Sequence, residues 1–137
     1  MDVGRILKKI IERENITLIQ LEERSEFTQA RLSQYIHGHR TPRIDTFARI
    51  LEVMVYELLV VNADGKMLRF HNFGVVVDYI MRKEDLKITK LATISGTDNS
   101  GLRRYIRGEV NPTMLVADKI LVSVNYAFKV AKKRSVE

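Results

Sequence analysis

Apolar residues recur at three- and four-residue spacing near the start of the chain and again seventy residues later. The positions are Ile6, Leu7, Ile10 and Ile11 in the first stretch, and Val76, Val77, Ile80 and Met81 in the second. This spacing places the apolar side chains on one face of a helix, while the charged residues between them face solvent. The pattern predicts one amphipathic helix at each place.

The agreement between these stretches extends over a long internal repeat. When residue n is aligned with residue n+70 without a gap, fourteen of the fifty-nine pairs from Val3/Phe73 to Val61/Ala131 are identical. Most identities fall on apolar, glycine and proline positions, while the polar positions between them differ. A repeat of this length predicts two copies of one folding unit.

Two further helices are expected in the middle of each copy. Thr17 and Gln20 have the spacing of a capping box, which predicts a short helix that runs to about Ser25. Thr28 and Asp98 are favourable N-caps for a third helix, which in the first copy is expected to end at Gly38.

A fourth helix is expected to begin around Pro42 in the first copy and Pro112 in the second. Proline fits the entrance of a helix because the first turn needs no backbone donor there. In the first copy this helix would bury Phe47, Ile50 and Leu51.

The segments after the fourth helices favour strands. Residues 53–61 are rich in strand formers, residues 62–65 indicate a turn, and residues 66–70 can return as a partner strand. The second copy keeps the alternation at Tyr126, Phe128 and Val130, and a basic tail follows. Three strands would form a small sheet that fixes the two units relative to each other. Because short apolar runs do not separate strand from helix by periodicity, a helix over residues 56–60 remains an alternative.

The second and third helices of each copy have apolar residues at the fourth, fifteenth and eighteenth places of a twenty-residue window. They are Leu21, Leu32 and Tyr35 in the first copy and Leu91, Leu102 and Tyr105 in the second. With the Gly-x-x-x-Pro that follows at residues 38–42 and 108–112, the pattern resembles the XRE, or phage Cro/repressor, family of helix-turn-helix domains. The resemblance implies a mainly α fold of two tandem λ-repressor-like domains.

The two copies depart differently from that family. The family has a small residue at the fifth place and glycine at the ninth, and the second copy has both, as Ala92 and Gly96. The first copy has Glu22 and Glu26 instead. At the first place, both copies have an apolar residue where the family often has a glutamine that contacts phosphate.

The resemblance implies that side chains near the start of each third helix enter the major groove of DNA. These residues are Gln29, Ala30, Ser33 and Gln34 in the first copy, and Asn99, Ser100, Arg103 and Arg104 in the second. Gln and Asn suit adenine, Arg suits guanine, and an alanine methyl can pack on thymine. The two copies are therefore expected to read different sequences. The open alternative for each residue is a polar helix face that is merely solvated.

Phosphate contacts are expected from polar and basic residues around these helices, and they would position the protein without specifying sequence. The candidates are Gln20, Arg31, Arg40 and Arg43, and Lys87, Lys90, Arg107 and Thr113. The charge agrees with a polyanion partner: the net charge is +6, and residues 71–137 hold twelve Lys/Arg against seven Asp/Glu. Through Phe70 the balance is eleven against ten.

Composition excludes several other classes. There is no cysteine, hence no disulfide framework or thiolate site, and this suits a cytoplasmic protein. The longest apolar stretches are interrupted by Glu57 and Asp78, so no transmembrane helix is expected. The sequence opens Met-Asp-Val-Gly instead of with a basic and then apolar segment, so no secretory leader is expected. His37 and His39 make only a weak metal pair, and we expect no metal, no cofactor and no enzymatic activity.

The sequence therefore predicts two domains, residues 1–61 and 73–137, joined by a linker or hairpin at residues 62–72. The expected function is a sequence-specific double-stranded DNA-binding regulator of the repressor type, from a bacterium or phage. A homodimer of such chains would offer four reading helices. The alternative is a protein-interaction module, antitoxin-like or a phage-encoded adaptor, in which one or both units no longer bind DNA.

Overall fold

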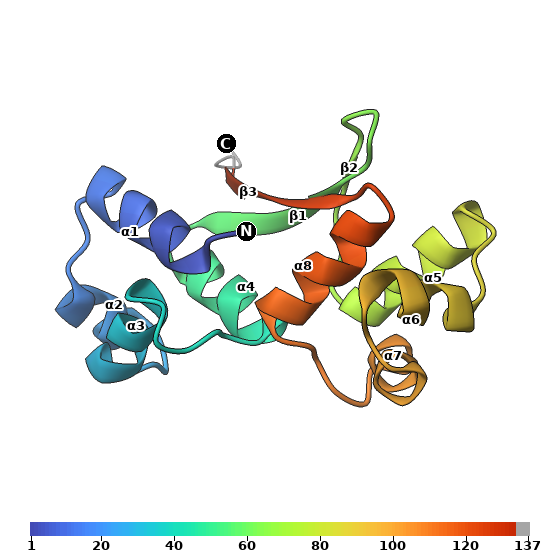
Figure 1. Cartoon of the computed structure of the whole chain (residues 1–137). Helices are drawn as coiled ribbons and strands as arrows, with labels where there is room; N and C mark the ends of the chain where they lie inside the picture. The colour runs from blue at the N-terminus through green and yellow to red at the C-terminus, as the bar shows by residue number, and fades with distance from the viewer. Residues whose placement is uncertain (134–137) are drawn as a thin grey trace.

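A computed structural model of the chain describes residues 1–133, which form two groups of four helices joined by a three-stranded sheet (Figure 1). The first group consists of α1 (Val3–Arg13), α2 (Leu18–Arg24), α3 (Gln29–Ile36) and α4 (Ile44–Val53). The second group consists of α5 (Phe73–Lys83), α6 (Ile88–Ser95), α7 (Asn99–Ile106) and α8 (Met114–Ser123). Each helix of the second group begins seventy residues after its counterpart, so the repeat in sequence is also a repeat of helices.

The helix starts follow the local chemistry of the sequence. The capping box predicted at the start of α2 is present: the Thr17 hydroxyl accepts from the Gln20 amide at 3.1 Å, and the Gln20 side chain accepts from the Thr17 amide at 3.0 Å. Thr28 and Asp98 cap α3 and α7, as expected. These caps satisfy amides that the first turn of a helix leaves without an internal partner.

The starts of α4 and α8 lie two residues later than the sequence suggests. Pro42 and Pro112 precede the helices instead of entering them, because their carbonyl groups accept hydrogen bonds from the other unit. The amide of Ile44 donates to the Pro112 carbonyl at 2.9 Å, and the amide of Met114 donates to the Pro42 carbonyl at 2.9 Å. The two four-helix groups are thus joined directly at this point.

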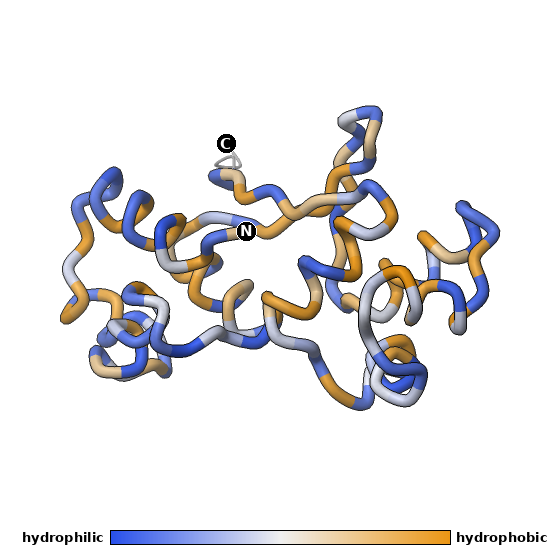
Figure 2. The backbone as a smooth tube through the Cα atoms, viewed as in Figure 1, coloured by the Kyte–Doolittle hydropathy of each residue, from blue (hydrophilic) through white to orange (hydrophobic). Residues whose placement is uncertain are grey.

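The apolar faces predicted for the helices meet in one continuous core. Hydrophilic segments lie mainly at the outer parts of the molecule (Figure 2). Leu21, Leu32 and Tyr35 are almost fully buried and hold α2 and α3 together. Gly4 allows α1 to lie directly on the end of α3, since an added Cβ would be 2.8 Å from the Tyr35 carbonyl oxygen and would overlap that of Ile36. Gly74 makes the equivalent close approach to α7.

The sheet has the strand order β2-β1-β3, with both pairings antiparallel. Its strands are β1 (Tyr56–Val61), β2 (Met67–Leu68) and β3 (Ala127–Lys132). The predicted three-stranded sheet is present, and the helical alternative for residues 56–60 is wrong. The strand bounds differ from the prediction: residues 53–55 finish and follow α4, the return strand is short, and β3 includes Lys132. The rest of the predicted basic tail, residues 134–137, lies outside the described residues.

An approximate two-fold axis relates the two halves. Leu59 pairs with Lys129 near the middle of the β1/β3 ladder, and Arg43 faces Thr113 in a bridge between the units. Both pairs join residues seventy positions apart, as a two-fold operation that exchanges n with n+70 requires of residues on its axis. The reciprocal hydrogen bonds before α4 and α8 obey the same rule. The chain therefore has the geometry of a symmetric dimer within one polypeptide.

One polar contact recurs in both halves and connects the sheet to the first helix of each unit. The Tyr56 hydroxyl donates to Glu14 at 2.8 Å, and the Tyr126 hydroxyl donates to Glu84 at 3.3 Å. Glu14 also receives the ammonium group of Lys132 at 2.9 Å. Hydrogen bonds from Lys132 and Tyr56 lower the pKa of Glu14, and burial, followed by the charge of Glu84, raises the pKa of Tyr126.

The turn between the fourth helix and its strand uses a left-handed residue in each half. Val55 has φ +63° and its counterpart Asn125 has φ +64°. Asparagine tolerates this region, whereas for a β-branched residue it is a genuine outlier. The Val55 side chain is 53% exposed, so burial of the side chain compensates little of this strain.

Candidate nucleic-acid interface

In the first unit, α2 and α3 meet through a short turn that places one face of α3 on the surface. Leu32 and Tyr35 point inward from α3 against Leu21 of α2. The opposite side of α3 therefore faces solvent along its length. A short second helix, a turn and a third helix with an exposed polar face form the arrangement that inserts into the major groove in helix-turn-helix proteins.

A comparison with family models supports this geometry. Residues 7–57 match the helix-turn-helix family model. The match covers α2, α3 and α4, most of α1 and the start of β1. The comparisons with curated proteins and with solved structures give no match. The match thus assigns a helix-turn-helix domain to the N-terminal unit of the chain.

The candidate base-reading residues of α3 differ in their freedom to reach DNA. Ala30 and Gln34 are exposed, while Gln29 and Ser33 are partly buried. The Gln29 amide donates to Glu22 at 2.8 Å, and the Gln29 side chain lies 3.4 Å from the same carboxylate. Gln29 is therefore partly committed to an interaction within the protein.

Glu22 stands at the fifth place of the window, where the family has a small residue, and it has a structural role there. In the second unit the counterpart Ala92 is buried, and the helices pack directly. In the first unit the carboxylate of Glu22 accepts from the first amide of α3, where a negative charge is favourable. Sequence reasoning missed this role, because the seven-residue spacing from Glu22 to Gln29 is no recognised signal.

The turns also differ in backbone conformation. Gly96 has φ +70° and ends α6 in the left-handed region. Its counterpart Glu26 does not have a positive φ; instead α2 ends one residue earlier, and Ser25 takes an extended conformation. The Ser25 hydroxyl accepts from the Phe27 amide at 3.2 Å and closes the turn. The first unit therefore avoids the strain that a glutamate would suffer in a glycine conformation.

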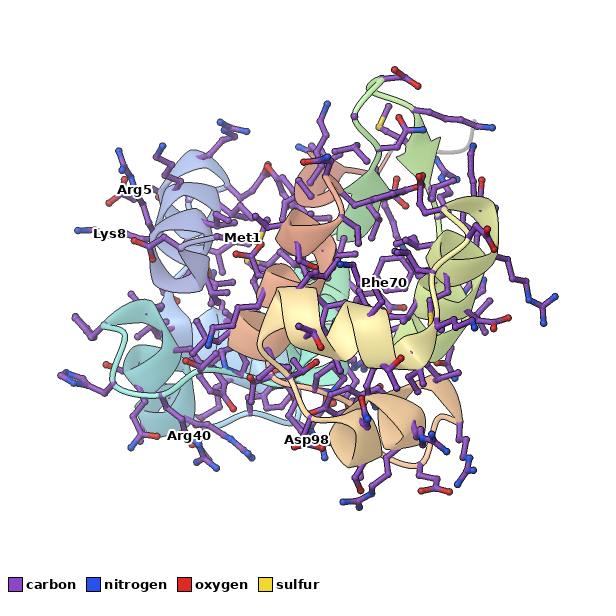
Figure 3. The ribbon with its side chains drawn as sticks, turned by 45° about the vertical axis from the view of Figure 1, so that its right-hand side comes forward. Met1, Arg5, Lys8, Arg40, Phe70 and Asp98 are labelled. Carbon is purple, nitrogen blue, oxygen red and sulfur yellow. The ribbon has the colours of Figure 1, made fainter. Side chains whose placement is uncertain are left out.

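The candidate phosphate contacts of the first unit are partly engaged within the protein. Arg31 donates to the Tyr35 hydroxyl at 2.9 Å, and Arg43 pairs with Asp45 at 2.8 Å. Gln20 is exposed but takes part in the capping box. Arg40 lies at the lower edge of the first unit in Figure 3 and is exposed.

The candidates on α7 form a more open and more basic face. Asn99, Ser100, Arg103 and Arg104 are all exposed. Arg104 lies 3.8 Å from Glu109, which also lies 3.9 Å from Arg107. These distances describe loose surface pairs, which hold side chains weakly and release them readily to a stronger anion.

The remaining candidates of the second unit lie near the starts of α6 and α8. Lys87 and Lys90 are exposed, and Lys87 is the N-cap residue of α6. The Thr113 hydroxyl accepts from the Val116 amide at 3.3 Å and caps α8. Because the backbones of Thr113 and Arg43 face each other on the two-fold axis, these two residues lie between the units instead of beside a single α3 or α7.

The two-fold axis brings α3 and α7 to the same side of the molecule. In Figure 1 they lie at the lower left and lower right, with the sheet on the opposite side. Helices α4 and α8 fill the space between them. The exposed faces of α3 and α7 are therefore related by the axis and lie on one side of the molecule.

Two other site types receive no support from residues 1–133. Within this range no group of three or more His, Asp or Glu side chains is placed to hold a metal ion. No helix of the same residues has the length and apolar character needed to cross a membrane. His37 and His39 stack at 6.2 Å near the end of α3, where the His37 ring also contacts Ser33.

Proposed function

We propose that the chain is a sequence-specific, double-stranded DNA-binding regulator made of two fused helix-turn-helix units. In this proposal α3 and α7 are the reading helices, and the protein acts in the cytoplasm as a repressor without enzymatic activity. The observation that carries the proposal is the two-fold relation between a unit that matches the helix-turn-helix family and a second unit with the same helix order. The units correspond to residues 1–61 and 73–137.

The second unit supplies most of the DNA affinity in this proposal. Its α7 face carries Arg103 and Arg104, and its turn has the alanine and glycine that direct helix packing favours. The α3 face has no arginine at the equivalent places, and Gln29 is held by Glu22. The two faces would thus recognise unlike half-sites, with the basic face preferring guanine.

The experiment is selection of bound duplexes from a random pool, followed by gel shifts with variants on the best site. Arg103→Ala and Arg104→Ala are each expected to weaken specific binding by about 1–3 kcal/mol and to relax base preference. Lys90→Ala is expected to weaken binding to all DNA sequences alike. It should also reduce the slope of log affinity against log salt concentration by about one. If Gln34→Ala weakens binding more than either arginine change, the ranking of the two units is wrong.

The joint between the units leads to a second test of the same proposal. Because two backbone hydrogen bonds and the β1/β3 ladder fix α3 relative to α7, the distance between half-sites is expected to be fixed. Insertion of about five base pairs, half a helical turn, should reduce binding to that of a single unit. Affinity that stays level across a spacer series, with a footprint over one half-site, would mean that only one unit reads DNA.

A second candidate function applies to the first unit. Its candidate DNA-contacting groups Gln29, Arg31 and Arg43 are engaged by Glu22, Tyr35 and Asp45 within the protein. This observation favours an interaction module in which the first unit binds a protein partner and the second binds DNA. The footprint above separates the two candidates, because an interaction module leaves one half-site unprotected.

A further inference from the structure

A groove of about 570 Å³ lies between the β2 hairpin and α5. Its floor and walls are largely apolar, and its rim is basic. It is lined by Lys66, Leu68, Arg69, Phe70, His71, Asn72, Val75, Val76 and Tyr79. None of these described lining residues carries a carboxylate, so the groove is suited to an apolar ligand that brings negative charge.

The outer face of α5 is apolar at positions where the first unit is charged. Val75 is 66% exposed and Tyr79 is 38% exposed. Their counterparts on α1, seventy residues earlier, are Arg5 and Lys9. Tyr79 is partly engaged, because its hydroxyl accepts a hydrogen bond from Lys83 at 3.4 Å. Its ring and the exposed Val75 side chain still form an apolar patch where α1 carries charged residues. The β2 hairpin lies beside α5, whereas no hairpin strand pairs with the outer edge of β3 among residues 1–133.

The strand beside this face has an open edge. In the β1/β2 pairing Val60 faces Leu68, and the Asn62 amide donates to the Lys66 carbonyl at 3.0 Å. The backbone N–H and C=O groups of successive residues in an antiparallel strand point alternately to opposite sides of the strand. The backbone groups of Lys66 and Leu68 therefore point toward β1, and those of Met67 and Arg69 point away from it. Among residues 1–133 the sheet ends at β2, and Arg69, the next outward-pointing residue after Met67, lines the groove.

We propose that this groove binds an extended acidic segment of a partner protein, which adds as a strand to the outer edge of β2. Backbone hydrogen bonds would form with Met67 and Arg69, and alternate apolar side chains would pack on Val75 and Tyr79. Carboxylates of the segment would face Lys66 and would compete with Glu57 for Arg69, whose exposed guanidinium lies 3.4 Å from the Glu57 carboxylate. The apolar lining and the open strand edge together identify a peptide as the ligand.

Other occupants fit the groove less well. Two copies of the chain that joined through this groove about a two-fold axis would bring the same basic rim together, and like charges would oppose the contact. Duplex DNA would match the charge but would leave Val75 and Tyr79 without apolar partners. In Figure 3 Phe70 lies well above Asp98, the cap of α7, so the groove is separate from the proposed reading face.

The test uses the full chain and a displayed library of random peptides of about ten residues, a length that covers a typical strand. Selection is expected to enrich sequences that alternate apolar and acidic residues. A synthetic peptide of the winning sequence is then titrated with wild type and with Val75→Gln and Tyr79→Gln, which remove the apolar groups without adding a charge. Each is expected to weaken binding by about tenfold or more. Arg5→Val serves as the matched control and should bind the peptide as wild type does.

Backbone pairing is tested separately from side-chain packing. Hydrogen exchange at the Met67 and Arg69 amides should slow when the peptide is bound, and proline substitution at the pairing positions of the peptide should abolish binding. The proposal is overturned if no acidic sequences are enriched, or if Val75→Gln binds the selected peptide as tightly as wild type does. It is also overturned if these amides become protected by self-association or by duplex DNA and not by the peptide. Since Val75 is exposed, its replacement leaves the core intact.

Discussion

Val55 offers a direct measurement of backbone strain, because the chain contains its own reference residue. Val55 and Asn125 occupy equivalent left-handed positions, with φ +63° and +64°. A left-handed conformation costs a non-glycine residue about 1–2 kcal/mol of conformational free energy. The cost is smaller for asparagine, because its short polar side chain can form local hydrogen bonds. Because Val55 is 53% exposed, Val55→Asn removes little buried apolar surface. The backbone bond from the Lys133 amide to the Val55 carbonyl, 2.9 Å long, does not depend on the side chain.

We therefore expect Val55→Asn to increase the free energy of unfolding by about 1 kcal/mol, or roughly 3–5 °C in Tm. The reverse change, Asn125→Val, should reduce stability by a similar amount. Urea and thermal unfolding followed by circular dichroism measure both. The control is Val122→Asn, since Val122 is 58% exposed within α8, where valine and asparagine have similar helix propensity. No gain for Val55→Asn relative to Val122→Asn would refute the strain argument.

Other substitutions test close packing, the turns and the acid response. Gly4→Ala should lower stability by about 2–3 kcal/mol, because the new methyl group overlaps the backbone of α3. Gly101→Ala in α7, whose methyl group would lie nearest the Asp98 side chain, at 3.1 Å, should change stability by less than about 1 kcal/mol in the same urea titration. Gly96→Ala should lower the free energy of unfolding by about 1 kcal/mol, because Gly96 has a left-handed φ. Glu26→Gly should not raise it, because Glu26 does not have a positive φ. If calorimetry showed the same change in stability for both variants, the difference between the two turns would be contradicted. The folded state lowers the pKa of Glu14, so the contribution of this carboxylate to stability is fully present above the ordinary glutamate pKa and is lost as the pH falls through the lower, folded pKa. The stability gap between wild type and Glu14→Gln should therefore narrow on acidification, and a constant gap from about pH 7 to about pH 3 would be inconsistent with this linkage.

Local chemistry allows much of the helical framework to be predicted. Thr17 with Gln20, Thr28 and Asp98 each specify a helix start through a side chain that satisfies nearby amides, so the signal is contained in three or four residues. The alternation of Tyr56, Leu58 and Val60 indicates a strand because its apolar positions face one side. These features need no knowledge of distant parts of the chain.

The features that the sequence did not predict depend on contacts made by the folded chain, most of them with residues far away in sequence. The prolines before α4 and α8 have the local pattern of helix entrances, but each gives its carbonyl to the other unit. The charge of Lys132 indicates a solvated tail, yet this residue extends β3 and pairs with Glu14. Glu22 has the sequence position of an acidic residue beside the DNA face, and its contact with Gln29 depends on how the turn folds. A pattern within one segment cannot reveal partners that the fold supplies.

The internal two-fold axis has a consequence for dose response. A regulator that must dimerise before it binds is present as dimer in proportion to the square of its concentration when it is scarce. The fused halves need no such encounter, because the second half is always at the high effective concentration set by the joint. If both halves bind DNA as proposed, occupancy of the site would rise in simple proportion to the number of chains, without a threshold. Because the halves are unequal, the bound chain would also have a direction along the duplex, and the α5 groove would always face the same flanking sequence.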